Sequence, residues 1–263
     1  MLPFFDISFS TTTEQFPTPP LLGGDPAYTC LQKAMIEGWR GDFAPLSGHA
    51  PAPIPWVGVQ LPGYGNPAAT GLQTNNLFQM RLAQAVGADA VKSADIVPTY
   101  DLSCPHCPWG SIHPTDKQDV GSRIAARLGY LIHNAPAAQG PKAVSATASR
   151  GSNNNTEISI VFTRAGAQPI RLIPTRNCTS CCNSGSDFDV SADGAKWVAG
   201  NGPAVVNDGD TVKFEVSLPD SLTPATTVLV RYTATQPFPQ CAVSDGDKLP
   251  AYPFQLRATT LFL

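Results

Sequence analysis

The segment between Asp101 and Thr115 holds the densest set of reactive side chains in this 263-residue sequence. It reads Cys104-Pro-His-Cys107-Pro-Trp-Gly-Ser-Ile-His113-Pro, so two cysteines at Cys-x-x-Cys spacing precede a histidine. A histidine held between a strand and a helix can act as a general base at the edge of an α/β sheet. Taken alone, however, His113 is more simply explained as a histidine that hydrogen-bonds the backbone of its loop.

The cysteines of this segment permit two other kinds of site. Cys104/Cys107 and Cys178/Cys181 each have the spacing found in zinc ribbons, although the two pairs fall in different predicted domains. A thioredoxin-type pair should open a helix directly after a strand, whereas this pair lies in a proline-rich loop. Both interpretations therefore explain the segment less well than one centred on the histidine.

Apolar periodicity predicts the elements that must position this loop. Leu31, Met35 and Trp39 recur at four-residue spacing, which predicts an amphipathic helix over residues 27–41. The apolar run 54–61 lies between two prolines and is typical of a buried parallel strand. A second helix is expected over 72–86. A second strand is expected over 94–102, where Pro98 confines it to a sheet edge or to two short pieces.

A third helix follows the loop. Thr115-x-x-Gln118 has the pattern of a capping box. The apolar residues that then repeat every three or four positions are Val120, Ile124, Leu128 and Leu131. Helices that alternate with strands predict an α/β fold with a parallel sheet, whose reactive loops lie beyond the carboxyl ends of the strands. The segment 101–115 is such a loop.

The chain changes character near residue 140. Ile158/Ile160/Phe162, Val212/Phe214/Val216 and Val228/Val230/Tyr232 each alternate with polar residues, as half-buried antiparallel strands do. These strands predict a β-sandwich over residues 140–263. Residues 1–24 offer no apolar period and carry several prolines, so we expect a poorly ordered leader there.

Composition excludes several classes of function. Charged residues make up 14% of the chain, and 17 basic against 20 acidic residues leave a net charge of −3 without a run of either sign. A basic stripe for nucleic acid is therefore missing, as is a cationic face for an anionic membrane. No apolar run is long enough to span a bilayer. The oligomeric state does not follow from these features.

Cysteine content and glycosylation patterns favour an oxidising compartment. The seven cysteines occur together with two N-x-[ST] patterns, Asn154-Asn155-Thr156 and Asn177-Cys178-Thr179. We therefore expect a secreted or lysosomal glycoprotein, although Asp6 interrupts the only apolar run of the N-terminus and no basic leader precedes it. If the protein is exported, Cys241 should form a disulfide with the cluster Cys178, Cys181 and Cys182.

The string DLSCPHCPWGSIHPTDKQDVGSRIA resembles the histidine block of sialate O-acetylesterases, a branch of the SGNH-type hydrolases. Other stretches agree in order and spacing, and they are Ala34-Met-Ile-x-x-Trp-Arg40-x-x-Phe43, Val59-Gln60-Leu61-Pro with Tyr64, Arg81-Leu-Ala-Gln84, and the tail with Cys181-Cys182, Cys241 and Pro253-Phe254. The resemblance implies that residues 25–139 form the C-terminal part of an SGNH-like, flavodoxin-like hydrolase domain. The β-sandwich of 140–263 would follow it.

The resemblance also implies roles for single residues. His113 would be the catalytic base. Gly110 stands where many SGNH hydrolases place the orienting aspartate, three residues before the histidine, so Asp101 becomes the candidate acid by proximity. Asp116 is better explained as a partner of the helix dipole. Gln60 and Gln84 are expected to be structural hydrogen-bonding groups near the site.

The family's nucleophile is not found in this sequence. Neither the Gly-Gln-Ser-Asn block nor the Trp-Tyr-Gln-Gly-Glu block occurs, and Ser111 lies too close to His113 in sequence to be its nucleophile. The resemblance thus implies a carbohydrate O-acetylesterase that acts on sialic acid or a related sugar by a Ser/His mechanism, without a metal or organic cofactor. This chain would be the half that lacks the serine and would be inactive alone. The alternatives are a non-catalytic carbohydrate-binding or interaction module and a truncated gene product.

Overall fold

The structure of the chain is a computed structural model. The structure describes residues 25–47, 53–64, 73–134, 140–151, 154–163, 169–175, 187–206, 209–218, 227–234, 238–239, 241–245 and 249–261. The predicted leader, residues 1–24, lies outside the described residues, and so does the segment 135–139 beside the predicted domain boundary.

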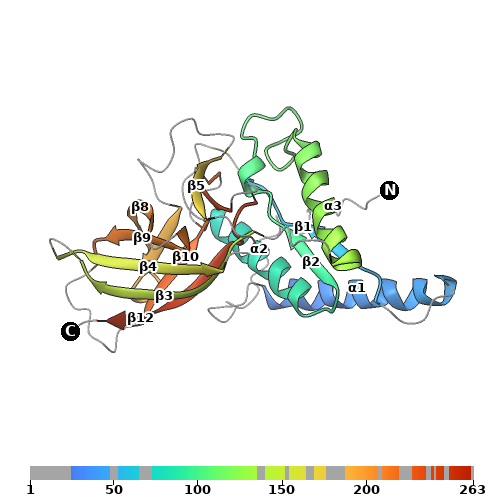
Figure 1. Ribbon diagram of the computed structural model, residues 1–263, viewed down its shortest axis with the longest axis horizontal. Helices are drawn as coiled ribbons and strands as arrows, with labels where there is room; N and C mark the ends of the chain where they lie inside the picture. The colour runs from blue at the N-terminus through green and yellow to red at the C-terminus, as the bar shows by residue number, and fades with distance from the viewer. Residues whose placement is uncertain are drawn as a thin grey trace.

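The first half of the chain forms a two-stranded parallel sheet with helices, as predicted (Figure 1). Its elements are α1 (Pro26–Ser47), β1 (Trp56–Val59), α2 (Gln73–Asp89), β2 (Ala94–Val97), the 3₁₀ turn η2 (Tyr100–Leu102) and α3 (Lys117–His133). In the parallel pair, Trp56 lies opposite Ala94 and Val59 lies opposite Val97. The far end of α1 projects away from the rest of the molecule (Figure 1).

The two strands differ from their predicted form. β2 ends at Val97, because the following Pro98 has no N–H to donate to a ladder, and the chain then tightens into η2. β1 is shorter than the predicted run 54–61 and is not fully buried, since Val59 is 39% exposed; Ile54, just before the strand, is 42% exposed. Among the described residues β2 is the only strand that pairs with β1, and helix α3 also contacts β1.

The buried face of α1 is rotated from the predicted one. Leu31 is 69% exposed, whereas Gln32 and Ile36 are buried. The side chain of Gln32 donates a hydrogen bond from Nε2 to the carbonyl oxygen of Gln84 on α2, at 3.2 Å. The face of α1 that contacts α2 therefore includes a polar residue, Gln32. The prediction considered apolar residues only, so it chose the adjacent residue Leu31.

The start of α3 is capped by a different residue from the one predicted. Asp116 is the N-cap, and its Oδ1 accepts a hydrogen bond from the backbone N–H of Asp119 at 3.0 Å. The predicted Thr115/Gln118 capping box is therefore wrong by one position. Asp116, which was expected to interact with the helix dipole, does so as the N-cap residue. Asn134 closes the helix in the left-handed conformation, with φ of 51°.

The second half is not the predicted β-sandwich but one eight-stranded mixed sheet that is nearly closed into a barrel. Its strand order is β7-β6-β10-β12-β3-β4-β9-β8. The bounds are β3 Lys142–Arg150, β4 Thr156–Thr163, β6 Phe188–Ser191, β7 Val198–Ala199, β8 Asn201–Val206, β9 Thr211–Val216, β10 Val228–Tyr232 and β12 Phe254–Leu261. A separate antiparallel pair is formed by β5 (Arg171–Pro174) and β11 (Cys241–Ser244).

The barrel nearly closes because its two edge strands are consecutive in the chain. β7 pairs with β6 and β8 pairs with β9, and only Gly200 separates β7 from β8. Phe188 of β6 and Phe214 of β9 stack at a centroid distance of 5.0 Å, although four strands separate β6 from β9 in the sheet order. A sandwich would divide these strands between two sheets, whereas here one sheet curves around a single aromatic interior.

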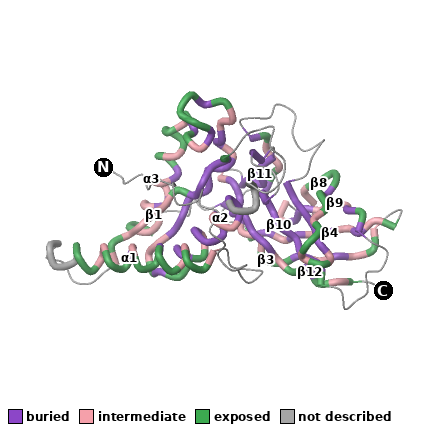
Figure 2. Tube along the Cα trace, turned by 180° about the vertical axis from the view of Figure 1, so that it is seen from behind, coloured by how far each residue is buried: buried purple, intermediate pink, exposed green. Residues whose placement is uncertain are grey.

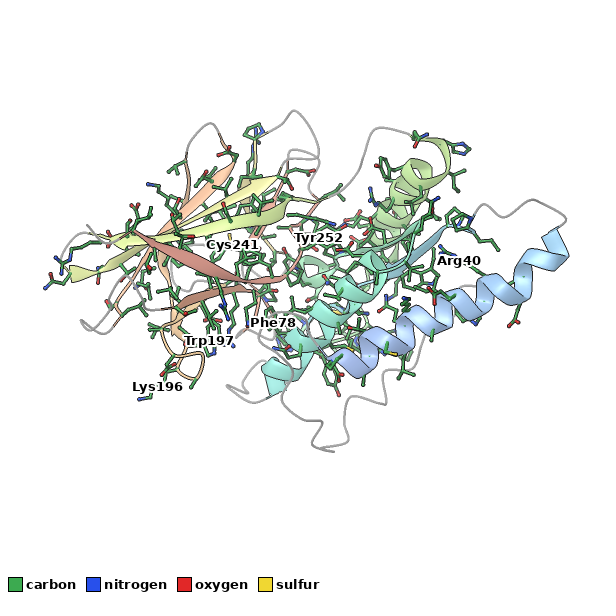
Figure 3. All side chains as sticks on the ribbon, turned by 90° about the horizontal axis from the view of Figure 1, so that it is seen from below. Arg40, Phe78, Lys196, Trp197, Cys241 and Tyr252 are labelled. Atoms are coloured by element: carbon green, nitrogen blue, oxygen red, sulfur yellow. A yellow bond between two sulfur atoms is a disulfide. The ribbon has the colours of Figure 1, made fainter. Side chains whose placement is uncertain are left out.

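The barrel and the α/β half share one buried junction. Tyr100 of η2 enters the barrel core, where its hydroxyl donates to the carbonyl oxygen of Ala251 at 2.9 Å and lies 3.2 Å from the hydroxyl of Tyr232. Phe78 of α2 and Tyr252 lie where the helices meet the barrel (Figure 3). Buried residues run through this junction from one half to the other (Figure 2).

Candidate active site

The candidate site is built on the carboxyl ends of β1 and β2. The chain leaves β1 at Gln60, whose backbone N–H donates to the carbonyl oxygen of Val97 at 2.9 Å. Thr99, just after β2, donates from Oγ1 to the carbonyl oxygen of Gln60 at 2.7 Å. These bonds hold the two exits together, so the loop 103–116 emerges at the carboxyl edge of the sheet, as the sequence predicts.

Three linked turns shape this loop. The backbone N–H groups of Cys107, Gly110 and His113 donate to the carbonyl oxygens of Cys104, Cys107 and Gly110, at 3.2, 3.1 and 3.1 Å respectively. Each turn begins at the residue where the previous turn ends. Gly110 has φ of 93°, a conformation that suits glycine, and the aspartate of the family pattern would be strained there.

A disulfide joins Cys104 and Cys107 across the first of these turns. With both sulfurs in this bond, neither residue offers a thiolate to a zinc ion. The other half of the proposed zinc ribbon, Cys178 and Cys181, lies outside the described residues. The pair also opens no helix, since α3 begins only at Lys117.

Among the described residues, no hydrogen bond joins the two predicted catalytic residues, His113 and Asp101. His113 is exposed, and within the described residues its side chain has no hydrogen bond or ion pair. Asp101 instead faces Arg123 of α3, whose Nη1 and Nη2 donate to its two carboxylate oxygens at 2.8 and 2.6 Å. The catalytic roles of His113 and Asp101 therefore remain predictions.

Two buried arginines of α3 are the site-supporting residues that the sequence analysis missed. Arg123 and Arg127 are more buried than the apolar residues that were expected to form the contact face, all of which are only half-buried. Arg127 forms an ion pair with Asp95 of β2, one helical turn from the pair that Arg123 forms with Asp101. Burial lowers the pKa of Arg123, but its hydrogen bonds with Asp101 outweigh this and leave that pKa raised. The available signal was a pair of arginines at i, i+4 spacing that follows one aspartate in the strand and another in the turn after it.

A third buried arginine, Arg81, holds the exit of β1. Arg81 of α2 is fully buried and donates from Nε to the carbonyl oxygen of Leu61 and from Nη2 to that of Pro62, both at 2.8 Å. A longer bond of 3.4 Å joins its Nη1 to the carbonyl oxygen of Thr233 in the barrel half. Burial lowers the pKa of Arg81 to about 10, so this side chain is still a cation at neutral pH.

Gln60 and Gln84 complete this support, as expected. Gln60 donates from Nε2 to the carbonyl oxygen of Arg81 at 2.9 Å. Gln84 accepts a hydrogen bond on Oε1 from the backbone N–H of Leu61 at 3.0 Å. Both glutamines fasten the loop exit to α2 and are structural hydrogen-bonding groups.

No serine of the described segments is hydrogen-bonded to His113. Ser103 is fully buried, where its hydroxyl accepts from the N–H of Gly63 at 2.6 Å and donates to the carbonyl oxygen of Tyr100. Ser111 is also buried. Among the described residues, the His113 side chain therefore has no serine hydroxyl bonded to it.

An apolar hollow of about 190 Å³ lies elsewhere, between α1 and the start of β1. It is lined by Ile36, Trp39, Arg40, Phe43, Ile54, Pro55 and Trp56. The guanidinium of Arg40 is held by carbonyl oxygens of Ile54, Lys92 and Ser93 at 2.8 to 3.0 Å, so it fixes α1 against the ends of both strands (Figure 3). This hollow does not include His113.

Among the described residues, no helix could cross a membrane.

Comparison with known proteins links the chain to carbohydrate esterases. No family model matches it. It is 31% identical over 242 residues to the sialate O-acetylesterase of Mus musculus, which covers 86% of this chain and 40% of the mouse protein. It is 30% identical over 247 residues to the sialate O-acetylesterase of Rattus norvegicus, covering 88% of this chain and 41% of the rat protein. The chain therefore spans about two fifths of the length of these curated relatives.

A solved structure has the same fold over the same extent. The crystal structure of a carbohydrate acetylesterase from Xanthomonas citri superposes with a TM-score of 0.62 at 21% sequence identity. The match covers 88% of this chain and 46% of the bacterial chain. The α/β half and the barrel thus occur together in a larger protein.

Proposed function

We propose that this chain, a distant homologue of the sialate O-acetylesterases, supplies the histidine-bearing part of a carbohydrate O-acetylesterase. Its substrate would be an O-acetylated sialic acid or a related sugar. The observation that carries the proposal is the position of His113, exposed on a loop of three linked turns at the carboxyl ends of two parallel strands. Such a position lets an imidazole reach a reacting group above the sheet edge.

In the proposed reaction a serine attacks the acetyl carbonyl. His113 takes the serine proton and passes it to the departing sugar oxygen, while backbone amides stabilise the oxyanion. Water then hydrolyses the acyl-enzyme with the same histidine as base. Because no serine of the described residues is bonded to His113, the nucleophile is assigned to the family's Gly-Gln-Ser-Asn block, which this sequence lacks. Asp101 is the candidate for the orienting acid, and in that role one of its oxygens would turn from Arg123 to the imidazole.

Export is part of the same proposal. The Cys104–Cys107 disulfide and the disulfide-bonded state of Cys241 support a secreted or lysosomal protein, because such bonds persist in oxidising compartments. Asn154 is exposed and could carry a glycan, whereas Asn177 lies outside the described residues.

The proposal is tested by acetate release from O-acetylated sialic acid. A longer version of the chain that includes an upstream Gly-Gln-Ser-Asn block should be active, and His113→Ala should lower its kcat by several orders of magnitude. His133→Ala, at the exposed end of α3, is the matched control and should leave kcat within about twofold. The 263-residue chain alone should hydrolyse the ester no faster than its own His113→Ala variant.

Two outcomes would contradict the proposal in different ways. Full activity of His113→Ala in the longer protein would remove this histidine from the reaction. Strong His113-dependent hydrolysis by the 263 residues alone would place a nucleophile inside this chain. Tight binding of acetylated sugars without any hydrolysis, in both the short and the long version, would support a carbohydrate-binding module instead.

A further inference from the structure

We propose that the Cys104–Cys107 disulfide is an exchangeable redox site that controls how firmly His113 is held. An external dithiol would reduce the bond, and reduction would loosen the turns that carry the histidine. The inference rests on the proposed function only for its effect on catalysis by His113. The redox chemistry and the change in the loop can be measured without esterase activity.

The disulfide lies on the surface loop and not between two elements of the fold. Cys104 is half-buried, Cys107 is buried, and His106 between them is exposed. Figure 2 shows exposed and buried residues alternating in the loop beside α3. The more accessible residue, Cys104, is therefore the point where an incoming thiolate can attack. Access to a sulfur is one of the conditions that decide whether a disulfide exchanges.

Reduction should leave the fold intact because the bond closes a very short loop. The two cysteines are three residues apart in sequence, so the bond joins no distant parts of the chain. A short closed loop restricts the unfolded chain less than a long one, and its contribution to global stability is correspondingly smaller. The buried supports of the site, such as the pairs Arg123–Asp101 and Arg127–Asp95, do not depend on it.

The bond is coupled to His113 through the three linked turns. The first turn, from Cys104 to Cys107, is the one that the disulfide closes covalently. Cys107 also accepts the hydrogen bond that opens the second turn, and Gly110 accepts the bond from His113 that closes the third. Reduction would therefore release the covalent restraint on Cys107, the residue at which the second turn begins, and the two turns that lead to His113 would lose their fixed starting point.

The exchange is a balanced two-electron reaction. A thiolate of the external dithiol attacks Sγ of Cys104, the Cys104–Cys107 bond breaks, and Cys107 leaves as a thiolate that takes a proton from water. The second thiol of the reductant then attacks the mixed disulfide and releases Cys104. The dithiol is oxidised to a disulfide, and the protein gains two thiols.

Differential alkylation provides the first test. The exposed free thiol of Cys30 is blocked first on the folded chain, which is then equilibrated with increasing dithiothreitol, alkylated with a second reagent and digested for mass spectrometry. Cys104 and Cys107 should be labelled at dithiothreitol concentrations at least tenfold below those that label Cys241, which is buried and disulfide-bonded. Labelling of all these cysteines together, or only after denaturant is added, would overturn the redox site.

A second measurement tests the coupling to the histidine. The NMR signals of the His113 imidazole, assigned by their loss in His113→Gln, should shift or broaden when the disulfide is reduced and return when it is reoxidised. The double variant C104S/C107S should show the same signals as the reduced protein. The signals of His133 on α3 should stay unchanged, and an unchanged circular dichroism spectrum shows that the variant is folded. Unchanged His113 signals in both reduced forms would refute the coupling, whether or not the esterase assay succeeds.

Discussion

Asp101, the middle residue of η2, and Arg123 of α3 form a bidentate ion pair with N–O distances of 2.8 and 2.6 Å. The Asp101 side chain is 14% exposed and that of Arg123 is 9% exposed, so both charges are largely removed from water. Arg123 also donates from Nη1 to the carbonyl oxygen of Pro98 at 2.8 Å. One guanidinium thus holds the chain on either side of Tyr100, directly before the loop that carries His113.

Replacing Asp101 with Asn should destabilise the protein by about 3 kcal/mol, because the charge of Arg123 is left buried without a counter-charge. Denaturant unfolding would measure the loss, and a double-mutant cycle with Arg123→Gln would isolate the pairwise part. The matched control is Glu37→Gln in the exposed pair Lys33–Glu37 of α1, which should change the free energy of unfolding by less than about 0.5 kcal/mol. A stable Asp101→Asn variant with a severely reduced kcat in the longer protein would instead identify Asp101 as the orienting acid.

Gly200 should tolerate no side chain, whereas Gly121 should. A Cβ at Gly200 would lie 2.3 Å from the ring of Phe214, where the barrel closes between β7 and β8. Gly200→Ala should therefore lower stability by about 2 kcal/mol through overpacking. Gly121 lies within α3 with open space around it, so Gly121→Ala should raise stability by up to about 1 kcal/mol. Equal effects of the two substitutions on the midpoint of unfolding would show that closure at Gly200 is not tight.

Tyr100 and Tyr232 should remain neutral until the protein unfolds at alkaline pH. Burial raises the pKa of both hydroxyls, and their mutual contact raises that of Tyr100 further, while the charge of Asp187 raises that of Tyr232. In the unfolded chain both ionise near their ordinary pKa of about 10, so above that pH the folded state binds more protons and stability falls as pH rises. Tyrosinate absorbance should therefore show their ionisation only together with loss of circular dichroism. Reversible ionisation of both hydroxyls in the folded protein would contradict their burial.

Cys241 should be cross-linked to Cys178, Cys181 or Cys182. Cys241 is disulfide-bonded, but the three predicted partners lie outside the described residues, so the pairing remains a prediction. A map of non-reduced peptides should contain this cross-link, and Cys241→Ser should cost about 2 to 4 kcal/mol. Cys30→Ser is the control, because that thiol is free and exposed and its loss should be nearly neutral. A map in which Cys241 joins none of the three would refute the pairing.

The local elements could be predicted from the sequence because their signals are local. Apolar periodicity and breaking residues located α1, α2 and α3, and alternation located β4, β9 and β10. The position of the His113 loop also followed, since chain order alone places it after a parallel strand. The resemblance to sialate O-acetylesterases is confirmed by the homology.

The tertiary structure alone decided how these elements are joined. The near-closure of the sheet brings Phe188 against Phe214, and no strand pattern contains that contact. The pairing of Asp101 with Arg123 could not be predicted from the sequence either. A carboxylate pairs with the cation that the tertiary packing brings nearest, and that cation need not be the histidine nearest in sequence. Periodicity reports which positions could be buried, whereas the partner that satisfies a buried charge or fills a curved core comes from residues far away along the chain.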